Sequence, residues 1–151
     1  MNSTEVQQEL AFGLENLERV YQNIIRFTAL VVEPDLKTSA LTYECLGYYN
    51  ALEHLMVRVL KALAYDIPSG AFSHRETLKL FCSLERTQFN NPKMLVALQT
   101  LMAFRHVATK IYGFLIEWEK LNVVVTDIQR FHPEFVRWFE TIRASFSEPL
   151  K

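Results

Sequence analysis

Glycine and proline are scarce in this sequence, with 4 Gly and 5 Pro spread over 151 residues. So few turn-forming residues favour long helices joined by short connections. There are only two cysteines, Cys45 and Cys82, and neither pairs with a histidine at a spacing typical of zinc ligands. Both lie in apolar stretches, so we expect two buried free thiols, no metal site and no cofactor.

Long apolar runs and a strong net charge are also missing. No stretch approaches the roughly 18 apolar residues that span a bilayer, and the polar residues 1–5 are unlike a secretory signal. We therefore expect a cytoplasmic protein without a membrane segment. The formal net charge of −1 argues against a surface that binds nucleic acid everywhere, but it allows a small positive cleft.

Apolar residues, by contrast, make up half of the chain, and 13% of all residues are aromatic. A chain of this length and composition can bury a core without disulfides. Apolar residues recur in steps of three and four. This pattern predicts helices over about 4–32, 38–65, 73–84, 92–119 and 123–145.

Several polar residues and prolines suggest where these helices begin or end. Asn91 is expected to cap the fourth helix, with Pro92 at its first position. Pro133 is expected to bend or restart the fifth helix, and residues 147–149 are expected to fray. No repeat or linker divides the chain. Residues 1–151 are therefore predicted to form one all-α domain, an antiparallel up-and-down bundle of four to five helices.

The fourth predicted helix carries an arginine where its core stripe should be apolar. Arg105 follows Leu101 at helical spacing, and Tyr112 comes seven residues later, so both side chains are expected on one helix face. A cation on such a face needs a partner or water. Three interpretations stay open: a buried ion pair, a dimer interface or a cleft. Glu44 and Glu53 on the second predicted helix either neutralise Arg105 or are surface charges.

The segment around this arginine, residues 104–114 (FRHVATKIYGF), resembles the signature helix of HepT-like proteins, which are HEPN-class toxin ribonucleases. The family motif is arginine, four residues, histidine, one residue and tyrosine. Arg105 and Tyr112 match its arginine and tyrosine. The resemblance implies a HEPN-type helical bundle that acts as a symmetric homodimer, with the Arg105 helices facing each other.

A second region resembles the same family, so that the resemblance covers roughly residues 10–120. It begins with residues 49–53 (YNALE) and continues with Asp66, Pro68, Gly70 and His74. Many family members carry a Trp-His pair after the proline and glycine. Here Ser73 replaces the tryptophan and His74 is kept. From its position alone, His74 is expected to be a turn or helix-start residue.

The chain departs from the motif at Lys110, which stands at the histidine position. In active members, the resemblance implies metal-independent RNA cleavage, in which histidine moves protons and arginine stabilises the developing charge. Lysine can hold a phosphate but is a poor base near neutral pH. His106 is the nearest imidazole in sequence, but it points about 100° away from Arg105 around the helix. It can still reach the site across a dimer. We expect ribonuclease activity to be weak or absent unless His106 substitutes.

As a whole, the resemblance implies an RNA-cleaving toxin, or a toxin-derived subunit, of a toxin–antitoxin module. The implied partner is a minimal nucleotidyltransferase antitoxin that transfers AMP to Tyr112, where Gly113 leaves room for approach. The bulky, negatively charged adenylate beside Arg105 then occupies the phosphate site and blocks the entry of RNA. The main alternative is a non-catalytic HEPN dimer that docks the nucleotidyltransferase or binds a nucleotide. Two further alternatives stay open: Tyr112 is a buried core tyrosine, or the protein is a structural helical dimer that binds no ligand.

Overall fold

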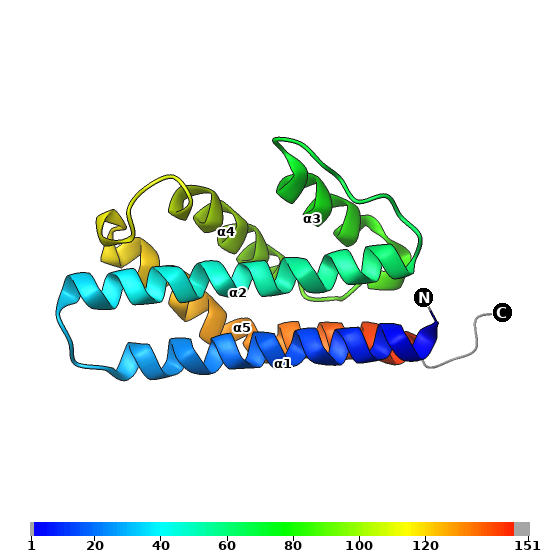
Figure 1. The fold of residues 1–151 in the computed structure, drawn as a ribbon, viewed down its shortest axis with the longest axis horizontal. Coiled ribbons are helices and arrows are strands. Elements are labelled where there is room, and N and C mark those ends of the chain that lie inside the picture. Colours follow the sequence, from blue (N-terminus) through cyan, green and yellow to red (C-terminus); the bar gives the residue numbers. More distant parts are fainter. Residues whose placement is uncertain (1, 147–151) are drawn as a thin grey trace.

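The computed structural model describes residues 2–146, and every regular element within them is helical (Figure 1). This confirms the predicted all-α class. The predicted frayed segment, 147–149, lies outside the described residues. The elements are α1 (Ser3–Ala29), α2 (Pro34–Ala62), α3 (Ser73–Ser83), η1 (Glu85–Thr87), α4 (Pro92–Ala108), η2 (Gly113–Leu115) and α5 (Trp118–Ser145).

Helices α1 and α2 run antiparallel and side by side and form the most extensive helix pair of the fold, with α5 packed behind them (Figure 1). The inward face of α1 carries apolar residues at the predicted spacing: Val6, Leu10, Leu14, Leu17 and Ile24. Gly13 lets the two helices approach closely. A Cβ at this position would lie 2.6 Å from both Leu55 and Arg58 of α2. Within residues 2–146, no helix has the length and apolar character needed to cross a membrane.

Helix α5 supplies the largest aromatic part of the core, including the buried Phe135, Trp138 and Phe139. The helix continues through Pro133, so the restart expected there does not occur. A proline inside a helix removes one backbone hydrogen bond. Here buried apolar side chains on both sides of Pro133 hold the helix in place against α1 and α2.

The end of α4 differs most from the sequence prediction. The helix stops at Ala108, although its apolar pattern continues toward 119. The following residues turn, form η2 and lead into α5, which begins at Trp118. Gly113 lies against α2, and a Cβ there would be only 3.4 Å from the Ser39 Cα. The apolar residues after 108 therefore belong to a connection packed on α2, with Ile116 buried.

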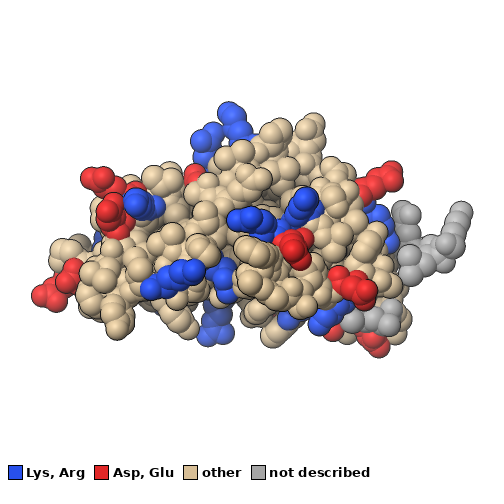
Figure 2. Space-filling model, turned by 90° about the horizontal axis from the view of Figure 1, so that it is seen from above, with Lys and Arg blue, Asp and Glu red and all other residues tan. Residues whose placement is uncertain are grey.

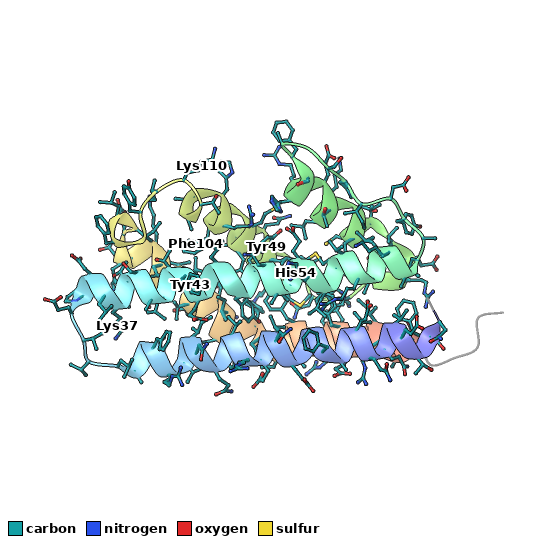
Figure 3. All side chains as sticks on the ribbon, in the orientation of Figure 1. Lys37, Tyr43, Tyr49, His54, Phe104 and Lys110 are labelled. Atoms are coloured by element: carbon teal, nitrogen blue, oxygen red, sulfur yellow. The ribbon has the colours of Figure 1, made fainter. Side chains whose placement is uncertain are left out.

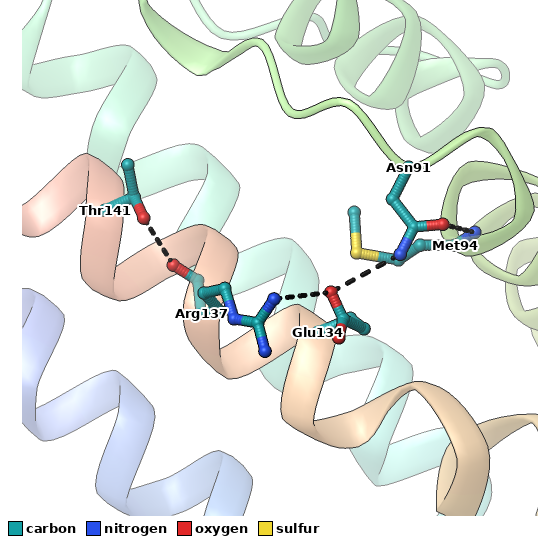
Figure 4. A network of polar contacts seen from close by, with 5 residues as sticks. All are labelled: Asn91, Met94, Glu134, Arg137 and Thr141. Carbon is teal, nitrogen blue, oxygen red and sulfur yellow. Dashed lines mark hydrogen bonds and ion pairs between the residues drawn. The ribbon is translucent and has the colours of Figure 1, made fainter.

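The start of α4 matches the prediction and is tied to α5 (Figure 4). The Asn91 side-chain oxygen accepts a hydrogen bond from the Met94 N–H at 3.1 Å, as expected of a helix cap. Its amide nitrogen donates to Glu134 of α5 at 3.4 Å, and Arg137 donates to the same carboxylate at 3.5 Å. These contacts connect the N-terminus of α4 to α5.

A polar network lies where α1, α2 and α5 meet, around the buried His132. One ring nitrogen of His132, Nδ1, is 2.9 Å from the Tyr48 hydroxyl, and the other, Nε2, is 2.5 Å from a Glu18 carboxylate oxygen. The imidazole also stacks on Tyr21, with ring centroids 3.7 Å apart. The sequence alone did not indicate that these residues meet, because they are far apart along the chain.

Candidate functional site

The site is a cleft between α3 and α4, which both lie on the same side of α2 (Figure 1). It has a volume of about 390 Å³, and four of its lining residues can carry positive charge: His74 and Arg75 of α3, and Arg105 and His106 of α4. A second hollow of about 570 Å³ shares Arg75 with the cleft and adds Lys79. Seen from this side, Lys and Arg side chains lie in the middle of the face with an acidic side chain beside them, and the other acidic side chains lie mostly toward its ends (Figure 2).

Arg105 is half-buried in this cleft and held by a neutral partner. Its Nε donates a hydrogen bond to the Asn50 side-chain oxygen of α2 at 3.2 Å. Within residues 2–146, no carboxylate lies at ion-pair distance from Arg105. Glu44 contacts Asn23, and Glu53 contacts His74. Of the three interpretations left open by the sequence, the cleft fits the position of Arg105 in the chain. A cation in a cleft without a carboxylate partner attracts anions.

Glu53 and His74 form a pair in the wall of the same cleft. The His74 Nδ1 lies 2.7 and 2.8 Å from the two Glu53 carboxylate oxygens. His74 is in the first turn of α3, as the sequence suggested, and its side chain remains 38% exposed, whereas Glu53 is 16% exposed. The sequence did not indicate that His74 would join Arg105 in one cavity.

Tyr49 lies beneath this group on α2 (Figure 3). Its ring is buried, and its hydroxyl lies beside the Glu53 carboxylate. Burial raises the pKa of Tyr49 well above its usual value; the negative charge of Glu53 adds to this effect and the positive charge of Arg105 opposes it. The phenol therefore stays protonated, and it provides a neutral polar group close to Glu53 and Arg105.

The other predicted site residues lie at different places. His106 lines the cleft but is exposed, and no described residue hydrogen-bonds its ring. Lys110 is exposed beyond the end of α4 (Figure 3) and is not among the residues that line the cleft. Because α4 stops at Ala108, the prediction that Arg105 and Tyr112 share one helix face is wrong.

Tyr112 lies in the connection before η2 and is 72% exposed, so it is not a core tyrosine. Its ring stacks on Phe114, with centroids 5.7 Å apart and planes 4° from parallel. Gly113 faces Ser39 of α2, so its missing side chain serves this close packing. The phenol is thus presented on the surface by a short, packed connection.

An apolar surface adjoins α4 on the side of α5. A hollow of about 430 Å³ there is lined by mostly apolar side chains, among them Phe104, Val107, Ile111, Leu115 and Val123. All but Phe104 are exposed by 41% or more. Tyr112 and Phe114 lie in the same connection. Contiguous exposed apolar patches of this kind commonly mark interaction sites.

A comparison with protein-family models shows what the chain is similar to. A family model described as "HepT-like protein" matches residues 40–146, which is well over half of the chain. The matched region begins in α2 and contains every residue that lines the cleft between α3 and α4. Neither curated proteins nor solved structures match the chain significantly.

Proposed function

We propose that this chain, which belongs to the HepT-like family, is a HEPN-type subunit that binds RNA. The RNA lies between α3 and α4, and Arg105 is the phosphate-binding residue. The observation that carries this proposal is the state of Arg105: half-buried, oriented by Asn50 and without a carboxylate partner in the described chain. A guanidinium held in this way matches the shape and charge of a phosphate.

The surroundings of Arg105 support a nucleic-acid ligand rather than a single small anion. Arg75 and His106 line the same cleft, and Lys79 extends the positive side chains along the adjoining hollow. This row of cations fits successive phosphates of one strand. Lys110 stands exposed at the end of α4, and in this proposal it adds positive charge at the edge of the site.

The module in which this subunit acts is a toxin–antitoxin pair. The chain is the RNA-cleaving toxin or a degenerate form of it, and its partner is a minimal nucleotidyltransferase that adenylylates Tyr112. The exposure of Tyr112 supports this role, because an enzyme can reach its hydroxyl without unfolding the chain.

The subunit acts as a homodimer through the apolar surface of α4 and α5. Val107, Ile111, Leu115 and Val123 would be covered by the same residues of a second copy, as a two-fold interface requires. The Arg105 clefts of the two copies would then lie near the same interface. Light scattering is expected to give a dimer mass, and Val107→Asp is expected to give a monomer.

The second candidate function is a non-catalytic HEPN dimer that docks the nucleotidyltransferase or binds a nucleotide. The position of Lys110 favours it, since the residue that replaces the motif histidine is outside the cleft.

RNA binding to purified protein tests the main proposal. Fluorescence anisotropy with a labelled oligoribonucleotide should show that Arg105→Ala weakens binding about 10- to 100-fold, because hydrogen bonds between charged groups contribute about 1.5–3 kcal/mol. Arg19, an exposed arginine of α1, provides the matched control. If Arg105→Ala binds RNA as tightly as Arg19→Ala does, the proposed role of the cleft is wrong.

A further inference from the structure

We propose that His74, oriented by Glu53, is the proton-transfer residue of the cleft between α3 and α4. The chain would then keep a general base although Lys110 replaces the motif histidine. This inference rests on the proposed RNA-binding function, and it adds the group that would make RNA cleavage possible. Glu53 is a positioning residue in this scheme, because it acts through His74.

The hydrogen bonds of His74 define which ring nitrogen can take a proton. Both Glu53 oxygens lie within 2.8 Å of Nδ1. A carboxylate only accepts hydrogen bonds, so Nδ1 carries the hydrogen and donates it. In the neutral ring Nε2 is then the acceptor. No described residue contacts Nε2 by a hydrogen bond, and 38% of the side chain is exposed, so this nitrogen is free to meet a ligand.

Helix α2 holds the base and the phosphate-binding residue from one face. Asn50 accepts the hydrogen bond from Arg105, and Glu53, three residues later, accepts the one from His74. Residues three apart on a helix are neighbours, with Cβ atoms about 5–6 Å apart. Two adjacent polar residues of α2 therefore anchor a guanidinium from α4 and an imidazole from α3 at the same cavity.

The other histidines do not combine these properties. His106 lines the cavity, but no group in the described chain orients its ring. His54 is exposed on α2 and is not part of the cavity lining (Figure 3). His132 is buried between α1, α2 and α5, with both ring nitrogens in contact with Tyr48 and Glu18. Within residues 2–146, His74 is thus the only oriented imidazole at the cleft.

The reaction that this geometry supports is cleavage of RNA by its own ribose. The His74 Nε2 takes the proton of the 2′-hydroxyl, and the oxygen attacks the adjacent phosphorus. The bond from phosphorus to the 5′ oxygen breaks, that oxygen takes a proton from solvent, and His74 returns its proton to solvent. The products are a 2′,3′-cyclic phosphate and a 5′-hydroxyl, and neither an oxidant nor a metal ion is consumed. Arg105 neutralises the charge that develops on the phosphate oxygens.

Charged side chains surround His74 on three helices: Glu53 on α2, Arg75 on its own helix α3, and Arg105 and His106 on α4. Of these, only Glu53 hydrogen-bonds the His74 ring in the described chain. Glu53→Gln should therefore lower kcat more than it changes KM, because the imidazole loses the carboxylate that orients it while Arg105 keeps its place in the cleft.

The test uses the full-length protein, with cleavage and binding measured separately. Cleavage of a labelled oligoribonucleotide is measured in the presence of a chelator, and binding is measured with a 2′-deoxy analogue that cannot be cleaved. His74→Gln should lower the cleavage rate about 10²- to 10⁴-fold, the usual contribution of a positioned base. Its affinity for the analogue should stay within about threefold. His54→Gln is the matched control and should leave both unchanged.

The outcomes separate this inference from the proposed function. If the unmodified protein cleaves RNA and His74→Gln cleaves equally well, His74 is not the base, while RNA binding in the cleft stands. If the analogue binds through Arg105 but RNA is not cleaved, the inference is also overturned and the non-catalytic alternative is supported. If Arg105→Ala binds as well as the unmodified protein does, the proposed function itself fails, and this inference fails with it.

A measurement on the unmodified protein covers the case in which His74→Gln does not fold. The ¹⁵N shifts of the imidazole should show hydrogen on Nδ1 and none on Nε2 when the ring is neutral. Adding the 2′-deoxy analogue should shift the His74 resonances and leave those of His54 in place. A neutral ring with hydrogen on Nε2 would contradict the assignment directly, because that tautomer cannot accept a proton from the ribose.

Discussion

Replacing His132 with alanine is expected to lower the free energy of unfolding by about 3–5 kcal/mol. The imidazole is buried where three helices meet, and it contacts a different helix on each side. Nδ1 lies against the Tyr48 hydroxyl of α2, Nε2 lies against Glu18 of α1, and the ring face stacks on Tyr21. Alanine keeps the helix but loses all of these contacts.

The magnitude follows from three effects of the substitution. Removing a buried ring leaves a cavity, and for large aromatic side chains this costs about 3–5 kcal/mol. The Tyr48 hydroxyl loses its partner while it remains buried, at a cost of about 1–3 kcal/mol. Loss of the stacked pair with Tyr21 costs about 0.5–1.5 kcal/mol. The imidazole is smaller than a phenyl ring and was itself costly to bury, so the three effects do not add in full, and we expect a total of about 3–5 kcal/mol.

Thermal and urea unfolding measure this change. For a chain of this length, each kcal/mol corresponds to about 2–4 °C in Tm, so His132→Ala should unfold roughly 10 °C below the unmodified protein. Tyr48→Phe, which removes only the hydroxyl, should cost about 1–3 kcal/mol. His54→Ala, an exposed control on α2, should stay within about 0.5 kcal/mol. A Tm loss for His132→Ala as small as that of His54→Ala would refute the structural role of the network.

Further predictions concern pH, the start of α4 and thiol reactivity. Burial lowers the pKa of His132. The partial burial of Glu18 would raise the pKa of its carboxyl, but hydrogen bonds from Gln22 and His132 outweigh this effect, so that the pKa of Glu18 is lowered. In both cases the unfolded chain binds more protons, so urea unfolding should show stability falling as pH drops below about 6.5 and again below about 4.5. Asn91→Ala removes the cap of α4 and should cost about 1 kcal/mol in the same assay. Burial raises the pKa of Cys45 to about 12, so at pH 8 a thiol reagent should modify Cys45 only after unfolding.

The spacing of apolar residues was sufficient to predict most of the fold. It placed α1, α2, α3 and α5 within a few residues of their observed bounds, because in these helices the buried face repeats in steps of three and four. It failed at the end of α4. Ile111, Leu115 and Ile116 continue the apolar pattern, yet they belong to a connection that packs on α2. Periodicity cannot distinguish these two arrangements, since both bury some of the same residues.

The candidate site was predictable only in part. Arg105 stood out because it interrupts an apolar stripe, a signal that lies within one helix. The family resemblance singled out residues 49–53 and His74, and Glu53 was considered as a possible partner of Arg105. Neither observation indicated that Asn50 would bind Arg105 or that Glu53 would bind His74, because these contacts join different helices. Only the packing of α3 and α4 on α2 brings them to one cavity.

Tyr112 gives the last prediction, because the structure offers an equally exposed control. Tyr112 and Tyr43 are both 72% exposed. Tyr43 lies on α2 (Figure 3), whereas Tyr112 lies on the connection after α4. A partner nucleotidyltransferase with ATP should add adenylate: the phenol oxygen attacks the α-phosphorus, pyrophosphate leaves, and the proton goes to solvent. Mass spectrometry should detect the addition in the unmodified protein and in Tyr43→Phe, but not in Tyr112→Phe. Exposure alone would make the two tyrosines equivalent, so equal loss in both variants, or modification that persists in Tyr112→Phe, would show that the partner does not recognise this connection.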